Sequence, residues 1–269
     1  MNYTFISDID GTLIKTNLPL HQRVVDAAIS FVDGGGRLTL STGRDISSVE
    51  AIVNLLPINA PCILYGGGLI YDFSTRTILW KQVLNIEILD VLDIIYRIEE
   101  SVSITIYNDT GIHMIRTNKI MRKHGVYEDR TAPFCRLSEI GGDILKVLLT
   151  CDDTAVLEGF RVNIICPNTF EYAASGKNFY EITPKGVNKG SSMIKLAELM
   201  NLPDNHFFAA GDAVTDLSMM KNAEMFFAPE SAPENIREMA DFVIPDPSDG
   251  GIVHAFEHIL NYINKQKNR

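Results

Sequence analysis

Long apolar runs are missing from this chain, although 46% of its residues are hydrophobic. Its longest apolar stretches are strand-sized and are interrupted by charge or glycine, whereas a membrane-spanning helix needs roughly 20 apolar residues. No signal-peptide pattern precedes Asp8. We therefore expect a globular protein with no membrane partner.

Positive charge is also scarce. The chain has 24 Lys and Arg residues against 34 Asp and Glu residues, a formal net charge of -10 at pH 7. No basic block resembles the footprint of a nucleic-acid-binding surface, and an acidic surface repels polyanions. Nucleic acid is therefore excluded as an expected partner.

Close cysteine pairs, which zinc sites and redox motifs use, are absent as well. The four cysteines lie far apart in the chain: Cys62, Cys135, Cys151 and Cys166. Free thiols in a reducing cytoplasm fit this spacing best, so we expect a cytoplasmic protein. Among the histidines, only His254 and His258 have helical i,i+4 spacing, and they lack the glutamate and third ligand of a zinc site.

What the chain does have is a pair of acids directly after its first apolar run, residues 3–6. Asp8 and Asp10 alternate at the end of a strand, which points both carboxylates the same way, and Gly11 allows a sharp turn. Such oxygens suit Mg²⁺, which usually keeps positions for water and a substrate phosphate. Taken alone, the motif is more simply a polar strand end followed by a turn.

Strands and helices alternate on either side of this motif. Helical spacing over residues 20–31 stops at a triple glycine, and a buried strand over 38–40 follows. The pattern continues with these elements: a helix over 46–55, a strand over 62–64, and later a helix over 191–200, a strand over 206–210, a helix over 217–221 and a strand over 225–227. The alternation predicts an α/β fold with a doubly wound, mostly parallel sheet.

The alternation is interrupted in the middle of the chain. After a hairpin over residues 69–80, strands over 104–106, 145–150 and 172–174 mix with helices. We expect an inserted α+β cap domain over residues 83–182, and a core built from residues 1–82 and 183–269. The polar tail from residue 264 is expected to fray.

Three further motifs fall at strand ends or at a helix start. They are Ser41-Thr42-Gly43-Arg44, Lys189 within Gly186-Val187-Asn188-Lys189-Gly190, and Gly211-Asp212-Ala213-Val214-Thr215-Asp216. In a doubly wound sheet the ligand binds at the carboxyl ends of the strands, where these motifs lie. Each motif alone has an ordinary structural explanation, but that explanation is improbable for the set in this order.

With Asp8-x-Asp10, these motifs match in order and spacing the haloacid dehalogenase-like superfamily. More narrowly, the chain resembles the Cof-type phosphatases, which carry a large α/β cap between the second and third motifs. The resemblance covers nearly the whole chain, from residues 63–72 before the cap to 240–251 near the carboxyl end. It implies a hydrolase that acts on small-molecule phosphate monoesters with Mg²⁺ as its cofactor.

Roles for the charged residues follow from phosphoryl chemistry. A phosphate monoester carries about two negative charges near neutral pH, so an anionic nucleophile needs that charge neutralised by Mg²⁺ and Lys189. Asp8 is the candidate nucleophile and forms an aspartyl phosphate. Asp10 is the candidate general acid, which protonates the leaving oxygen and later activates water.

The resemblance also implies a ligand set. It places Mg²⁺ on the Asp8 side chain, the Asp10 backbone carbonyl and Asp212, with Asp216 in support. The remaining implied substrate contacts are Thr42 and Gly43 as a phosphate cradle, Arg44 pointing toward substrate or cap, and Thr215.

Three positions depart from the family pattern: Thr215, Gly66 and Ser231 stand where asparagine is usual. A threonine hydroxyl still donates one hydrogen bond, with shorter reach. Gly66 removes a polar side chain from the expected substrate side. We therefore expect retained hydrolysis with an altered substrate preference.

Substrate identity is expected to reside in the cap. Two sets of cap residues are open to either a structural or a substrate-binding interpretation: the basic cluster Lys119, Arg122, Lys123 and His124, and the aromatics Tyr107, Phe134, Tyr172 and Phe179. The alternatives to a general phosphatase are a sugar phosphomutase, a flavin or pyridoxal phosphatase, and a catalytically silent metabolite-binding protein. The chain is expected to be a monomer or a homodimer.

Overall fold

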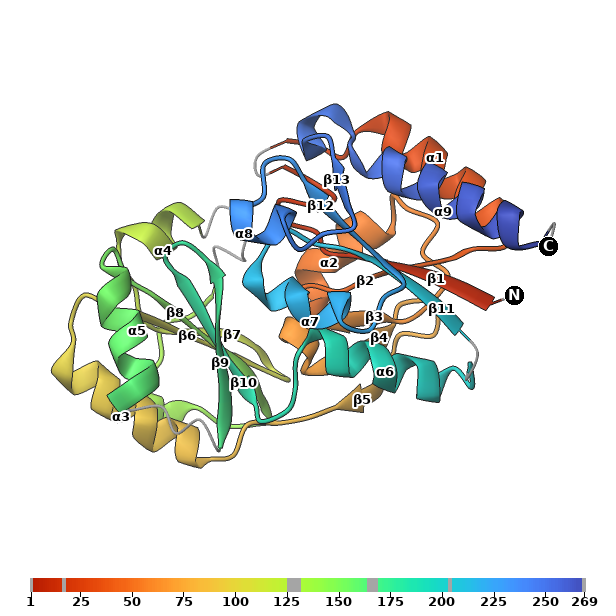
Figure 1. Ribbon diagram of the computed structural model, residues 1–269. Coiled ribbons are helices and arrows are strands. Elements are labelled where there is room, and N and C mark those ends of the chain that lie inside the picture. The colour runs from red at the N-terminus through yellow and green to blue at the C-terminus, as the bar shows by residue number, and fades with distance from the viewer. Residues whose placement is uncertain (1, 16–17, 125–131, 164–168, 203–204, 268–269) are drawn as a thin grey trace.

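The computed structural model describes residues 2–15, 18–124, 132–163, 169–202 and 205–267. A parallel sheet in the order β13-β12-β11-β1-β2 forms the centre of the larger body in Figure 1. Its strands are β1 (Asn2–Ser7), β2 (Arg37–Leu40), β11 (Asn205–Ala210), β12 (Met225–Pro229) and β13 (Phe242–Ile244). Strand β1, near the start of the chain, therefore pairs with β11 from its last third.

Helices cover both faces of this sheet. Successive residues of β1 point to opposite faces, and the apolar side chains on each face pack against a different set of helices. Phe5 packs edge-to-face against Phe256 of α9, with ring centroids 5.1 Å apart. Ile6, its neighbour, joins a separate core with Met193 of α6. The helices of this body are α1 (Gln22–Asp33), α2 (Ile46–Val53), α6 (Lys189–Leu199), α7 (Leu217–Met220), α8 (Glu234–Arg237) and α9 (Ile252–Lys267).

Caps and glycines set the helix ends much as the sequence predicts. Helix α1 ends at Gly34, the first residue of the glycine triplet. Helix α2 begins at Asp45, whose carboxylate accepts from the N–H groups of Ser47 and Ser48. The tail predicted to fray from residue 264 is helical as far as Lys267, where α9 ends.

A short antiparallel sheet links the two bodies of the molecule. Strand β3 (Cys62–Leu64) forms the predicted hairpin sheet with β4 (Leu69–Asp72) and β5 (Thr77–Lys81). Strand β3 also extends the parallel sheet through a bridge from Ser41 to Ile63. Between β3 and β4, a single 3₁₀ turn, η1 (Tyr65–Gly67), reverses the chain.

The smaller body is an antiparallel sheet in the order β7-β6-β8-β10-β9, on the left of Figure 1. Its elements are α3 (Glu87–Ile98), β6 (Ser103–Asn108), β7 (Gly111–Arg116), α4 (Lys119–His124), β8 (Ile144–Thr150), α5 (Thr154–Asn163), β9 (Phe170–Gly176) and β10 (Phe179–Pro184). It has its own hydrophobic core. We propose that this body is the cap domain over residues 83–182, inserted into a core of 1–82 and 183–269.

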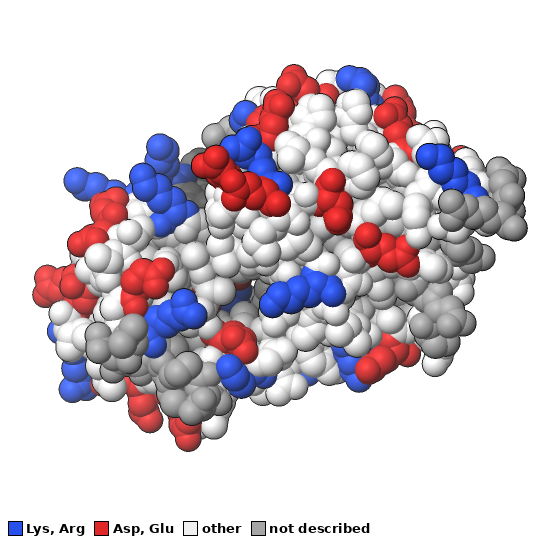
Figure 2. Space-filling view, in the orientation of Figure 1, with Lys and Arg blue, Asp and Glu red and all other residues white. Residues whose placement is uncertain are grey.

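The expected fold class, a doubly wound mostly parallel sheet with an added α+β cap, is confirmed. Cys62, Cys135 and Cys151 are free thiols, and Cys166 lies outside the described residues. None of the helices in the described part of the chain is long and apolar enough to cross a bilayer. On the face shown in Figure 2, acidic and basic side chains are interspersed over both bodies.

Candidate active site

The predicted motifs converge at one edge of the parallel sheet. Strands β1, β2 and β11 run parallel, so the residues that follow Ser7, Leu40 and Ala210 share that edge. The first turn of α6 reaches the same place, where Asn188 caps the helix by accepting from the N–H of Ser191. A cavity of about 400 Å³ opens here between the sheet edge and the cap.

Lys189 ties two carboxylates together at the floor of this cavity. Its Nζ lies 2.6 Å from Asp8 Oδ1 and 2.6 Å from Asp216 Oδ1. All three residues are buried, with 6% of Asp8, 4% of Lys189 and 0% of Asp216 exposed. A buried ammonium with two carboxylate partners is held in a fixed position.

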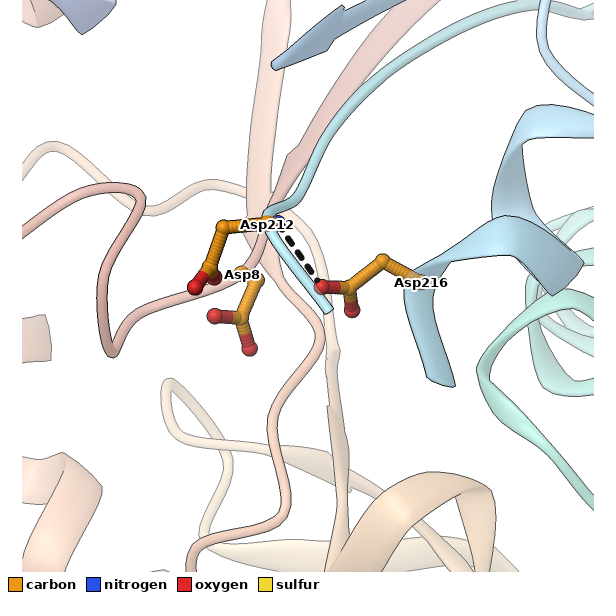
Figure 3. A group of neighbouring side chains, drawn as sticks. All are labelled: Asp8, Asp212 and Asp216. Carbon is orange, nitrogen blue, oxygen red and sulfur yellow. Dashed lines mark hydrogen bonds between the residues drawn. The ribbon is translucent and has the colours of Figure 1, made fainter. Parts of the chain in front are cut away.

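Asp212 completes the acidic group. Figure 3 shows Asp8 and Asp212 side by side, with Asp216 pointing toward them from the start of α7. The second oxygen of Asp216 accepts from the N–H groups of Asp212 and Ala213, at 3.0 and 2.9 Å. Asp216 thus orders the loop that presents Asp212.

The turn after β1 fits closely against Asp212. The hydroxyl of Thr12 donates to Asp212 Oδ1 at 2.9 Å. Gly11 has φ of +85°, and a Cβ there would lie 2.4 Å from Asp212 Oδ2. Glycine is therefore required at this position for two reasons: its backbone is left-handed, and the Asp212 carboxylate occupies the space that a side chain would need.

Burial and crowding shift the acid equilibria of this group. Burial raises the pKa of Asp8 well above its ordinary value, and the nearby acids add to this although Lys189 opposes it. Burial and the charge of Asp216 raise the pKa of Asp212 to about 7. Burial alone would lower the pKa of Lys189, but the charges of Asp216 and Asp8 outweigh it and raise that pKa.

These residues fit a divalent cation. Asp8, Asp212 and Asp216 each offer an oxygen, and the three oxygens lie within 4.8 Å of one another. Three acids share one lysine, so a bound cation would add positive charge where the carboxylates outnumber the ammonium. Asp8 and Asp212 have more ligating capacity left than Asp216, whose two oxygens already accept three hydrogen bonds.

The Asp10 side chain lies apart from this group. Both of its oxygens contact the Arg44 guanidinium, at 2.8 Å from Nε and 2.5 Å from Nη2. The sequence predicted that Arg44 points toward substrate or cap. In the structure Arg44 lines the cavity and its guanidinium binds the Asp10 carboxylate. The pair places a potential acid at the cavity rim, on a bidentate clamp.

Thr42 and Gly43 present hydrogen-bond donors to the cavity. The Thr42 hydroxyl oxygen accepts from the N–H of Arg44 at 3.2 Å. Within the described ranges, no acceptor is bonded to the Thr42 hydroxyl hydrogen or to the Gly43 N–H. Both residues line the cavity, as does Thr215. Free donors beside a buried ammonium are suited to the oxygens of a phosphate.

Sequence reasoning missed the cap residues of the cavity, with the exception of Phe179. Lys146 of β8 and Glu181 of β10 line it, and they form an ion pair of 3.0 Å. The available signal was the single charge in the otherwise apolar run of β8. Other cap residues that line the cavity are Leu148, Ser175, Gly176, Lys177 and Phe179.

Of the four candidate aromatics, Phe179 alone is among the cavity-lining residues. Tyr107 is fully buried, Tyr172 packs against Tyr180, and Phe134 is 65% exposed elsewhere on the cap. The basic residues Lys119, Arg122 and Lys123 are exposed on α4 and do not line the cavity. The side chain of His124 lies outside the described residues.

A family model for haloacid dehalogenase-like hydrolases matches residues 5–256. The chain belongs to this family. The predicted resemblance to a hydrolase of this kind is thereby confirmed, and the match extends across both bodies of the molecule.

Curated relatives align with this hydrolase over nearly its whole length. The 5-amino-6-(5-phospho-D-ribitylamino)uracil phosphatase YwtE of Bacillus subtilis (strain 168) is 24% identical over 283 residues, covering 94% of this chain and 96% of that protein. The pyridoxal phosphate phosphatase YbhA of Escherichia coli (strain K12) is 23% identical over 266 residues, covering 94% and 97%.

Solved structures share the fold of this hydrolase. A haloacid dehalogenase-like hydrolase from Bacteroides thetaiotaomicron superposes with a TM-score of 0.79 at 24% identity, covering 96% of this chain and 100% of that chain. The subclass IIB sugar phosphatase BT4131 superposes with a TM-score of 0.81 at 18% identity, covering 96% and 99%. Both alignments include the cap as well as the core.

Proposed function

We propose that this hydrolase is a phosphatase that cleaves small-molecule phosphate monoesters, with Asp8 as the nucleophile. The observation that carries the proposal is Asp8 buried against Lys189, at 2.6 Å, on the floor of a cavity lined by the free donors of Thr42 and Gly43. The printed substrates of its relatives, a ribitylaminouracil phosphate and pyridoxal phosphate, support a small phosphate ester as substrate.

In the first half of the reaction, Thr42 and Gly43 hold the phosphate oxygens and Lys189 offsets their charge. An Asp8 oxygen attacks phosphorus as the bond to the leaving oxygen breaks, which gives an aspartyl phosphate. Asp10 donates a proton to the leaving oxygen. Because both Asp10 oxygens lie on Arg44, that ion pair has to open for Asp10 to reach the leaving group.

In the second half, a water oxygen forms a bond to phosphorus while Asp10 takes a proton from that water. The bond between phosphorus and Asp8 then breaks, which releases inorganic phosphate and restores the carboxylate. Lys189 holds Asp8 Oδ1 in place through both steps, since the position of the ammonium is fixed by Asp216.

Mg²⁺ is the proposed cofactor. Asp8 and Asp212 would hold it through carboxylate oxygens and Asp10 through its backbone carbonyl, while Asp216 orders the Asp212 loop. When bound, the cation supplies positive charge that offsets the negative charge of the phosphoryl group. Thr215, on the cavity wall, would contribute a hydroxyl to the substrate.

The test is phosphate release from a panel of sugar, nucleotide and cofactor monophosphates, with Mg²⁺ and with a chelator. We expect metal-dependent release by the native protein and a loss of at least a thousandfold in Asp8→Asn, which still binds phosphate esters in calorimetry. Asp33→Asn, an exposed acid at the end of α1, is the matched control and should retain full activity. Undiminished turnover in Asp8→Asn would refute the nucleophile.

A further inference from the structure

The cap contributes one buried ion pair to the cavity. Lys146 and Glu181 have side chains that are only 2% and 10% exposed, and Lys146 Nζ lies 3.0 Å from Glu181 Oε1. The same ammonium lies 4.3 Å from the centre of the Tyr107 ring. Removing two charges from water is costly, so a pair in this position needs a compensating arrangement or a function.

This pair is seated on the core rather than within the cap alone. Lys146 Nζ donates to the backbone carbonyl of Gly43 at 2.5 Å. A Cβ on Gly43 would lie 2.6 Å from Glu181 Oε1, and a Cβ on Gly66 would lie 2.9 Å from Glu181 Oε2. The Glu181 carboxylate therefore occupies a space that two glycines of the core loops leave open.

The two oxygens of Glu181 differ in their partners. Oε1 accepts from Lys146. Across the described ranges of the chain, no donor is bonded to Oε2, although Glu181 lines the cavity. An oxygen without a donor, on a largely buried carboxylate that lines the cavity, favours a ligand that brings one.

We propose that Glu181 is a specificity-determining residue, whose Oε2 accepts a hydrogen bond from a hydroxyl or amine of the leaving group. Lys146 is its positioning residue, because it holds Oε1 and the Gly43 carbonyl together. The preferred substrates are then phosphate esters of alcohols that carry a second hydrogen-bond donor near the ester oxygen. This inference rests on the proposed phosphatase function, and it places in the cap the polar contact that Gly66 cannot make.

The test compares glycerol 3-phosphate with n-propyl phosphate, which lacks the two free hydroxyls. In Glu181→Gln, the amide oxygen faces Lys146, which has no acceptor of its own, so the NH₂ group takes the place of Oε2 and cannot accept. We expect the ratio of kcat/KM for glycerol 3-phosphate over n-propyl phosphate to fall at least tenfold. Glu171→Gln, an acid of β9 paired with Lys185, is the matched control and should keep the ratio.

If Glu181 had a purely structural role, Glu181→Gln would lower kcat/KM for both esters equally and leave their ratio unchanged. An unchanged ratio, with or without a loss of activity, would overturn the proposal. Lys146→Met/Glu181→Met removes both charges and both acceptor oxygens at once, so it avoids an unpaired buried ammonium if the single variant folds poorly. It should lose the same selectivity.

Binding measurements with Asp8→Asn test the Glu181 contact independently of the proposed phosphatase reaction. If the native protein releases phosphate from neither ester, the proposed reaction fails, while the Glu181 contact is still measurable by calorimetry in Asp8→Asn. Tighter binding of glycerol 3-phosphate that is lost in Asp8→Asn/Glu181→Gln would support the contact. Equal binding of the two esters by Asp8→Asn would overturn it.

Discussion

Charge crowding is the main feature of the site at the scale of single residues. Asp8, Asp212 and Asp216 share one ammonium, that of Lys189, in a largely buried space. A protein selected for stability alone has little reason to retain such a group, because each buried like charge weakens the fold. The cation proposed above would account for the crowding, because it would bring the positive charge that three carboxylates and one ammonium leave unbalanced.

The raised pKa of Asp212, about 7, makes stability depend on pH. An acid with a higher pKa in the folded state favours folding below its unfolded pKa and loses that contribution as pH rises through the folded pKa. We therefore expect the metal-free protein to lose up to about 4 kcal/mol from this group between pH 4 and pH 8. Denaturant unfolding with a chelator present measures the slope.

Asp212→Asn is the variant that checks this assignment. It should flatten the pH dependence and stabilise the metal-free protein at pH 8, while abolishing the stabilisation by Mg²⁺. In the native protein, stabilisation by Mg²⁺ should grow from pH 6 to pH 8, because the cation competes with the proton. Because the pKa of Asp8 is raised as well, part of the slope should remain in Asp212→Asn, whereas an unchanged slope would assign the titration to another group.

At the scale of elements, the first turn of α6 decides where Lys189 sits. Gly190 packs so closely on the start of α7 that a Cβ would lie 1.9 Å from the carbonyl oxygen of Ser218. Ser192 fixes the other side of the turn by donating to the Gly67 carbonyl at 2.6 Å. The helix start is thus held between two loops, and Lys189 is held with it.

Gly190→Ala should move this helix start. Because the obstacle is backbone, we expect a loss of about 1 to 3 kcal/mol in unfolding free energy, with at least a tenfold loss in kcat as Lys189 shifts from Asp8. Gly159→Ala is the control, since its Cβ would enter open space on α5. That variant should be neutral or more stable by up to about 1 kcal/mol. Equal effects of the two changes would contradict the packing argument.

Elements with clear periodicity or flanking glycines were predictable from the sequence. The helix over 20–31 and its glycine stop correspond to α1 and Gly34, shifted by about two residues. Strand β10 was not predicted because Glu181 interrupts its apolar pattern. That charge is buried only because Lys146 and two core glycines meet it, and such long-range partners leave no local pattern.

The site was predictable for a related reason. Asp8, Thr42 and Asp212 each lie within two residues of a strand end, so the topology of a parallel sheet brings them together without knowledge of side-chain packing. The Arg44 clamp on Asp10 needed the structure, since the two residues lie 34 positions apart and no periodicity relates them. Their pairing depends on how two loops pack.

At the scale of the whole molecule, the cavity is lined by residues of both bodies, such as Asp8 and Lys146. Ligands that bind the folded state alone should therefore stabilise core and cap together. At a hundred times its dissociation constant, inorganic phosphate added to the Mg²⁺-loaded protein should add about 2.7 kcal/mol. Thermal melts should show a single transition that rises by several degrees. Two transitions, with the cap unaffected, would contradict a shared site.

The pairing of β1 with β11 also bears on how the chain reaches its native state. Asn2 pairs with Asn205, so one side of the central strand stays open until the last third of the chain has been synthesised. The cap sheet is formed within residues 103–184, by contacts that are closer in sequence. We expect the cap to fold early and the core sheet to close last, so that catalytic competence coincides with completion of the fold.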